Sequence, residues 1–121
     1  MFDNMKMMGA LAGLMKNKDA IKAAGERIRA RMPELRAQGN GGGGAVRATV
    51  DGTMKLIEIT FDPTFAEHGL AKDPNAAAPM IVEAVNRAVE IAQEMVKREI
   101  KKEADALGLP DMPGLEKMFG A

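Results

Sequence analysis

Basic side chains in two predicted helices are the groups in this chain best suited to chemistry. Three share one stripe of a helix near the N-terminus, and three cluster near the end of a later helix. In chain order they are Lys18, Lys22, Arg29, Lys97, Lys101 and Lys102. Lysine and arginine can contact phosphate groups, and such contacts position a protein on a nucleic acid without reading its bases. The later cluster also has a structural explanation, because cations near a helix C-terminus complement the helix dipole.

Catalytic chemistry has few candidates in this sequence. The chain contains no cysteine, no serine, and a single histidine, His68, which follows Glu67. A histidine beside a carboxylate can act as an acid–base pair, but a catalytic site needs several groups in different roles. We therefore predict that His68 is a loop residue and that the protein is not an enzyme. We expect no catalytic, cofactor-binding or metal-binding residues, and no small-molecule substrate.

The net charge of zero conceals an uneven distribution. Residues 1–50 hold nine basic and four acidic side chains, whereas residues 51–121 hold eight basic and thirteen acidic ones. This asymmetry is a hint of binding to nucleic acid or to another charged surface. It fits equally well a chain whose two halves attract each other. The absence of cysteine indicates a reducing cytoplasm, and with 3% aromatic residues the chain cannot rely on base stacking.

The first long pattern is helical and covers residues 14–35. Apolar side chains recur there at every seventh position. They are Leu14, Ile21, Ile28 and Leu35. This spacing forms the narrow seam of a helix packed against another helix. Arg27 and Arg31 flank the seam on the side opposite the basic stripe, where their methylene groups can cover its edge. Pro33 predicts a kink or a restart, and Gln38-Gly39-Asn40 predicts the end of the helix.

A β-hairpin is predicted after this helix. Its first strand alternates apolar with polar residues, which places one side of the strand on a core. The apolar residues are Val46, Ala48 and Val50. Asp51-Gly52 predicts a tight turn with positive φ at the glycine. The second strand is predicted from Met54 to Phe61, with Ile57, Ile59 and Phe61 on its apolar face. Gly41 to Gly44 precede the hairpin as an irregular lead-in.

A second long helix is predicted from Asp73-Pro74 to about Leu107. Asp73 fits an N-cap and Pro74 the first helical position, while Gly108 and Pro110 end the pattern. The tail that follows carries apolar residues at helical spacing, namely Leu115, Met118 and Phe119. It either docks as a short amphipathic turn or stays mobile, and the sequence does not decide between these alternatives.

Several features together resemble the YbaB/EbfC family of bacterial nucleoid-associated DNA-binding proteins. They are the glycine run, the valine-alternating strand, a short turn, a second strand closing on Phe61-Asp62-Pro63, and a long helix carrying Ala84-Val85-Asn86. The resemblance includes the Pro-Gly-containing tail near Pro110 to Gly114. It implies an α+β fold, with a long helix, an antiparallel hairpin or small sheet, and a second long helix. Members often form an additional short strand in the glycine region.

The resemblance also implies a tweezer-like homodimer in the cytoplasm, associated with the nucleoid. We predict a single YbaB/EbfC-like domain over residues 1–109 and a C-terminal tail over residues 110–121. Self-association agrees with the physical pattern, because two strands alone are marginal in water. The apolar seam of the first helix also needs a cover, and closed twofold dimers are the commonest solution.

Two functional hypotheses follow from these observations. In the first, the homodimer binds duplex DNA through phosphate contacts with little sequence specificity, using the six basic residues named above. In the second, the chain is a non-enzymatic scaffold or protein-partner module that uses its helical seam and a methionine-rich N-terminus. The methionines in question are Met5, Met7, Met8 and Met15. No membrane association is expected, because the apolar segment at the N-terminus is far too short to span a bilayer.

Overall fold

The structure is a computed structural model that describes residues 8–9, 17–110 and 114–119. It divides into two compact units, one formed by residues 32–96 and the other by the described residues of 1–31 together with those of 97–121. No helix among the described residues is long and apolar enough to cross a membrane. Helices and a small antiparallel sheet together confirm the predicted α+β class.

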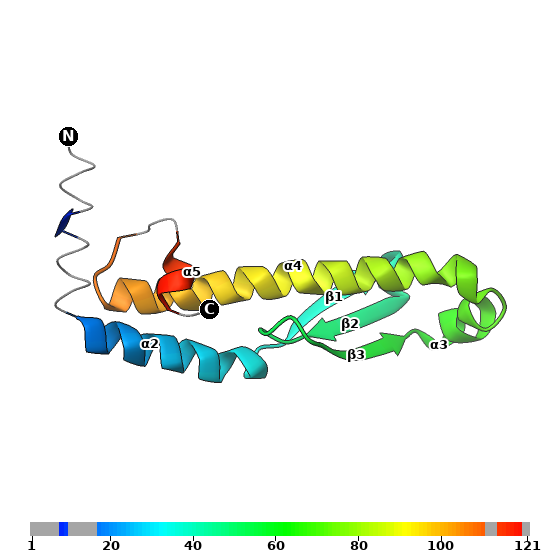
Figure 1. Cartoon of the computed structure of the whole chain (residues 1–121). Helices are drawn as coiled ribbons and strands as arrows, with labels where there is room; N and C mark the ends of the chain where they lie inside the picture. Colours follow the sequence, from blue (N-terminus) through cyan, green and yellow to red (C-terminus); the bar gives the residue numbers. More distant parts are fainter. Residues whose placement is uncertain (1–7, 10–16, 111–113, 120–121) are drawn as a thin grey trace. The chain divides into compact units, whose positions relative to one another are not determined.

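The unit of residues 32–96 is built on a three-stranded antiparallel sheet in the order β1-β2-β3. The strands are β1 (Ala37–Gly41), β2 (Val46–Val50) and β3 (Leu56–Phe61). The part of helix α4 (Pro74–Ala106) that belongs to this unit, residues 74–96, lies along one face of the sheet (Figure 1). The opposite face carries polar side chains, among them Arg47 and Glu58, because successive strand residues point to opposite sides.

The sheet and α4 meet through unusually small residues. The buried cluster between them consists of Ala37, Val46, Ala48, Val50, Ala84, Ala88 and Ala92. On β1 the residues that face α4 include Gly39, where an added Cβ would collide with backbone atoms of Ala84 and Ala88. At Gly41, an added Cβ would collide with the carbonyl oxygen of Met80. The strand therefore lies directly on the helix backbone, which only glycine permits at these positions.

The structure corrects the predicted end of the first helix. Helix α2 (Lys18–Arg31) stops before Pro33, and a single 3-10 turn follows over Met32–Glu34. Gln38-Gly39-Asn40, predicted as a helix end, belongs instead to β1 and pairs with Thr49, Ala48 and Arg47. Proline explains the stop, since it lacks a donor and disfavours helical geometry in the residue before it. The glycine run then forms a tight turn in which Gly42, Gly43 and Gly44 have positive φ.

The β2–β3 connection also differs from the prediction. Positive φ occurs at Met54 (φ 67) and not at Gly52. Gly52 is required for a different reason, because an added Cβ would lie 2.5 Å from the carbonyl oxygen of Met32. The loop is organised by the buried carboxylate of Asp51, whose Oδ1 accepts hydrogen bonds from Thr53 N (2.8 Å), Thr53 Oγ1 (2.6 Å) and Lys55 N (3.1 Å). The hydrogen bond from the Thr53 side chain is the main cause that lowers the pKa of Asp51.

An irregular register on β3 changes which side chains are buried. Thr49 pairs with Glu58 and Val50 pairs with Leu56, so Ile57 is an extra residue that bulges out of the ladder. Ile59 and Phe61 lie half-buried against the core as predicted, whereas Ile57 is 47% exposed. Leu56 is exposed to the same extent. The expected apolar face of β3 therefore covers only part of the strand.

The predicted second helix is confirmed almost to the residue. Asp73 Oδ1 accepts a hydrogen bond from Ala76 N (3.2 Å), as expected of an N-cap. Residues 74–96 of α4 belong to the unit with the sheet, and residues 97–106 belong to the other unit. Between the sheet and α4, the chain forms short helical turns over Pro63–Phe65 (α3) and Ala66–Leu70.

The other compact unit contains α2, the end of α4 and the short helix α5 (Leu115–Met118), which lie side by side in Figure 1. Ile28 of α2 has 0% exposure within the single chain. The predicted seam is therefore covered at Ile28 by the chain itself, and Ile21 is half-buried. Leu14 lies outside the described residues. Phe119 is buried in this unit and contacts Gly25, so the tail is docked on α2.

We predict that Gly39→Ala strongly destabilises the fold. The new Cβ would also lie 2.9 Å from Ala88 Cα, and a helix backbone cannot move aside as a flexible side chain can. Overpacking of this kind costs about 2 kcal/mol or more of unfolding free energy. Chemical denaturation measures the change. Asn40→Ala is the matched control, since Asn40 is the exposed neighbour on the same strand. Equal stability of both variants would contradict the close approach.

Candidate nucleic-acid interface

The basic residues of α2 divide into two groups, and the first is used within the chain. Arg27 donates to Glu103 through Nε (3.3 Å) and Nη2 (2.9 Å). Arg31 also pairs with Glu103 through Nη2, and its Nη1 lies 2.9 Å from Glu99 Oε2. The last contact is an ion pair without hydrogen-bond alignment. These four residues join α2 to the end of α4. The two helices run antiparallel there, since Arg27 pairs with Glu103 whereas Arg31, one turn later in α2, also reaches Glu99, one turn earlier in α4.

Glu103 is the centre of this cluster. Its side chain is only 11% exposed, so an unpaired carboxylate there would be costly. The hydrogen bond from Arg27 lowers the pKa of Glu103 below its usual value of 4.5, outweighing the opposite effect of burial. The same hydrogen bond raises the pKa of Arg27. Both arginines therefore compensate the carboxylates of α4 and hold the two helices together.

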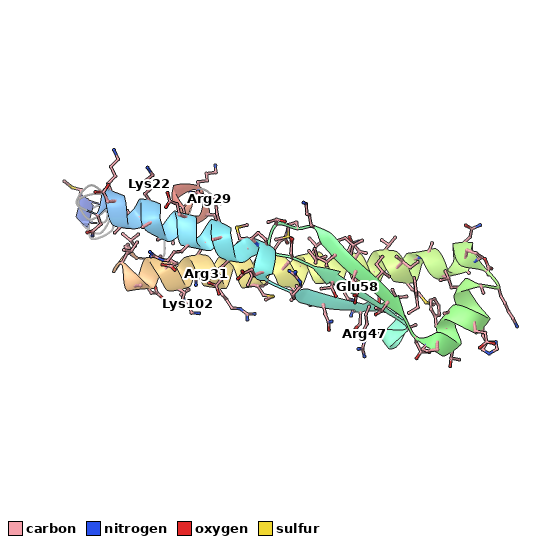
Figure 2. All side chains as sticks on the ribbon, turned by 90° about the horizontal axis from the view of Figure 1, so that it is seen from below. Lys22, Arg29, Arg31, Arg47, Glu58 and Lys102 are labelled. Carbon is pink, nitrogen blue, oxygen red and sulfur yellow. The ribbon has the colours of Figure 1, made fainter. Side chains whose placement is uncertain are left out.

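The second group of basic residues lines a groove of about 590 Å³ on α2. Figure 2 shows Lys22 and Arg29 projecting from the side of α2 that faces away from α4, whereas Arg31 points toward α4. The groove is lined by Lys18, Asp19, Ile21, Lys22, Gly25, Arg29, Lys117 and Phe119. Four of these residues are basic and one is acidic. The structure thus brings together the three predicted residues of α2 and adds a fourth cation from α5.

The four cations that line the groove are not neutralised by ion pairs with other described residues. Within the part of the chain that the structure describes, Lys18, Lys22 and Lys117 form no ion pair, and all are exposed. Arg29 donates from Nη1 to the backbone oxygen of Phe119 (3.3 Å), a neutral acceptor that leaves its charge uncompensated. Four cations around one hollow create a positive potential that suits an anion.

The remaining predicted residues lie elsewhere in the same unit. Lys97, Lys101 and Lys102 are exposed on the end of α4. In Figure 2, Lys102 projects from the side of α4 away from α2, on the opposite edge of the unit from Lys22. Lys102 Nζ lies 4.0 Å from Glu99 Oε1, which weakens its positive field. The structure therefore does not join the two predicted sets into one surface.

Sequence reasoning missed Lys117. Its signal was present, because Leu115, Met118 and Phe119 have helical spacing and Lys117 falls between them. What the sequence left open was whether this short segment docks. In the structure it does, with Leu115 and Phe119 buried at 6% and 1% exposure.

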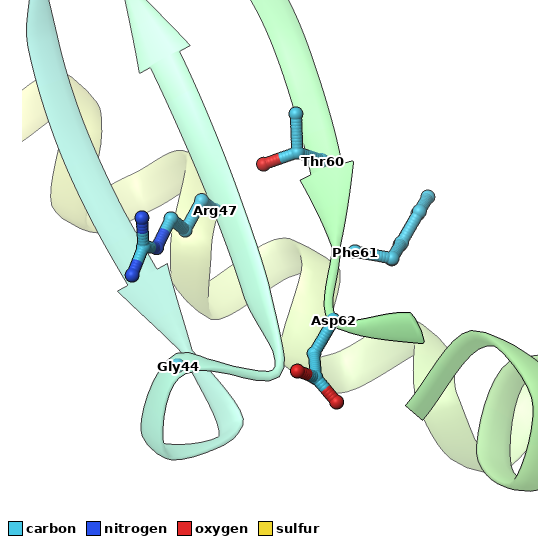
Figure 3. A pocket seen from close by; sticks show the side chains of 5 residues that line it. All are labelled: Gly44, Arg47, Thr60, Phe61 and Asp62. Carbon is cyan, nitrogen blue, oxygen red and sulfur yellow. The ribbon is translucent and has the colours of Figure 1, made fainter. Parts of the chain in front are cut away.

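A second hollow and the single histidine lie in the unit that holds the sheet. The hollow has a volume of about 190 Å³ and lies at the end of the sheet, lined by Gly44, Arg47, Thr60, Phe61 and Asp62 (Figure 3). Asp62 there caps α3 by accepting a hydrogen bond from Phe65 N (3.3 Å). His68 Nε2 lies 3.9 Å from Glu67 Oε2, and both side chains are exposed. No group of three or more potential metal ligands occurs among the described residues.

Comparison with known proteins gives a consistent result. The profile of the YbaB/EbfC DNA-binding family matches residues 7–107. A nucleoid-associated protein of Chlorobaculum tepidum is 33% identical over 107 residues, which cover 88% of this chain and 90% of that protein. One of Moorella thermoacetica is 31% identical over 103 residues, covering 85% and 96% respectively. The crystal structure of an uncharacterized Helicobacter pylori protein shares the fold, with a TM-score of 0.57, 21% identity, and coverage of 76% of this chain and 90% of that one.

We predict that Glu103→Gln lowers the unfolding free energy by about 1 to 3 kcal/mol at neutral pH, because it removes a charge-assisted pair. Since the pKa of Glu103 is lowered by folding, its contribution is complete above about pH 4.5 and declines as the pH falls through the lowered pKa. The difference between wild type and variant should therefore shrink on acidification. Denaturation curves over that pH range measure it, with Glu26→Gln on the exposed side of α2 as control. If the difference in unfolding free energy between wild type and Glu103→Gln did not change with pH, the ionised Glu103 carboxylate would not be the source of the stabilisation.

Proposed function

Because the chain belongs to the YbaB/EbfC DNA-binding family, we propose that it binds duplex DNA through phosphate contacts and with little sequence preference. Membership of this family identifies a DNA-binding protein rather than an enzyme. The relatives' description as nucleoid-associated supports a place in the nucleoid for this chain as well.

The observation that carries the proposal is the basic groove of α2. Its four cations form no ion pair among the described residues and outnumber the one carboxylate of the lining, Asp19, whereas Arg27 and Arg31 on the other side of the helix are paired with Glu99 and Glu103. This partition explains how a chain with 17 basic and 17 acidic residues can still attract DNA. Each phosphate that such a cation neutralises releases counterions, which is the main source of sequence-independent affinity.

The chemistry of the groove favours phosphate over bases. Reading base edges commonly uses asparagine, glutamine or arginine in bidentate contacts. The lining of the groove contains no asparagine or glutamine. Its one arginine, Arg29, donates a hydrogen bond to the backbone oxygen of Phe119. The chain also contains no tryptophan or tyrosine on which bases could stack. Lys97, Lys101 and Lys102 form a second, separate set of proposed phosphate contacts on α4.

A homodimer is the second part of the proposal. Leu56 and Ile57, each 47% exposed, are adjacent on β3, which forms an edge of the sheet. An open strand edge with exposed apolar residues is a surface that proteins usually cover. A second copy of the chain would cover it and would present every basic groove twice. The seam of α2 is a weaker candidate for this contact because Ile28 is already buried.

We predict that Lys18→Glu combined with Lys22→Glu weakens binding to all duplex sequences alike. The slope of log binding constant against log salt concentration should become less steep by about 0.9 for each phosphate that the variant no longer neutralises. Fluorescence anisotropy with labelled duplexes of unrelated sequence measures both quantities. These two lysines are preferable to Arg29, because Arg29 also binds the tail and its replacement would disturb the tail.

Lys55→Glu combined with Lys72→Glu is the matched control. It changes the net charge equally but alters exposed residues of the unit that holds the sheet.

Wild-type protein that shows no salt-dependent binding at low ionic strength would refute DNA binding. The alternative, a non-enzymatic scaffold or protein-partner module that uses the helical seam and the methionine-rich N-terminus, would then take its place. The methionine-rich N-terminus of that alternative lies, except for Met8, outside the described residues.

We also predict that the wild type sediments as a dimer at micromolar concentration and that Leu56→Asp with Ile57→Asp shifts it toward monomer. Burying unpaired charges in an apolar contact costs several kcal/mol. Sedimentation equilibrium measures the change. Asn75→Asp with Ala78→Asp adds two charges at exposed positions in the first turns of α4, where acidic groups are tolerated. A folded wild-type monomer would overturn the dimer proposal.

A further inference from the structure

The C-terminal tail is held on α2 at two positions one helical turn apart. A Cβ added at Gly25 would lie 2.6 Å from the backbone oxygen of Phe119, so the tail backbone rests directly on the helix. Arg29 Nη1 donates to the same oxygen (3.3 Å). The ring of Phe119 is 1% exposed, which makes it one of the largest fully buried side chains among the described residues. Phe119 is therefore fixed by burial as well as by the hydrogen bond to its backbone oxygen.

This docking determines where Lys117 lies. Lys117 is two residues before Phe119, on the exposed side of α5, and it lines the groove together with Lys18, Lys22 and Arg29. Without the tail, the groove would have three cations and one carboxylate, Asp19, among the residues that remain. With the tail, a fourth cation faces the same hollow from a second element. The tail thus supplies part of the groove wall and a third of its net positive charge.

We propose that the docked tail is a working part of the DNA-binding surface, in which Phe119 anchors α5 on Gly25 and Lys117 contacts a backbone phosphate. This inference rests on the proposed DNA binding and deepens it. It concerns residues beyond the range 7–107 that the family profile matches. The ligand chemistry is a duplex phosphodiester, because the groove offers cations from two elements and no amide side chain for a base edge.

The test uses the full-length chain and the same labelled duplexes. Lys117→Ala should reduce the steepness of the salt slope by about 0.9, which corresponds to about eightfold weaker binding at about 0.1 M salt. Lys72→Ala removes the same charge from an exposed position in the other unit and should leave both values unchanged. Because Lys117 is exposed, its replacement should not affect folding, and circular dichroism checks this.

A double-mutant cycle tests the anchoring role of Phe119. Phe119→Ala should release the tail and weaken DNA binding at least as much as Lys117→Ala does. The combination of both changes should then be no worse than Phe119→Ala alone, because a released lysine no longer reaches the groove phosphate. If Phe119→Ala prevents folding, Lys117→Ala with its control still decides the phosphate contact, and the milder Phe119→Leu replaces Phe119→Ala in the cycle to test the anchoring role.

The outcomes separate this inference from the underlying function. If the wild type binds DNA with the expected salt dependence and Lys117→Ala binds identically, the tail is only a structural cover for α2 and the inference is wrong. If Lys117→Ala weakens binding but Phe119→Ala does not, the lysine acts without docking and the anchoring role is wrong. A wild type that does not bind duplex DNA overturns both the inference and the proposed function.

Discussion

The close approach of β1 to α4 is the constraint on which the rest of the sheet depends. Alanines at positions 84, 88 and 92 form a stripe of small residues along α4, and Gly39 and Gly41 place a strand against it without side chains between. A core of alanine and valine buries little apolar area per residue, so its stability comes from tight packing. Any side chain between strand and helix would separate them and weaken that packing.

This geometry also explains why the sheet leaves apolar residues exposed. The alanine stripe is narrow and accommodates β1 and β2 most closely, so the core consists of residues from these two strands and α4. On β3, Ile59 and Phe61 pack against the edge of that core, while the bulge near the beginning of the strand takes Ile57 out of the ladder. The exposed pair Leu56 and Ile57 is thus a consequence of how the sheet meets the helix.

The charged residues of α2 differ between its two sides, depending on whether that side packs against the end of α4. On the side that meets the end of α4, the largely buried carboxylates of Glu99 and Glu103 require partners, and Glu103 lies between two arginines. On the other side, a glycine at position 25 admits the tail, and the lysines around it face solvent unpaired. One helix therefore combines a structural ion-pair cluster with a basic groove. A net charge of zero says nothing about either.

The sequence by itself determined the elements whose signals are local. Alternation predicted β2, Asp73 and Pro74 predicted the start of α4, and the order of these features indicated the family. Tertiary structure decided the rest. Gln38-Gly39-Asn40 has poor strand propensity, so its pairing depends on the helix beneath it. Likewise, Arg27 and Arg29 are chemically identical, and only the positions of Glu103 and the docked tail make one structural and leave the other in the groove.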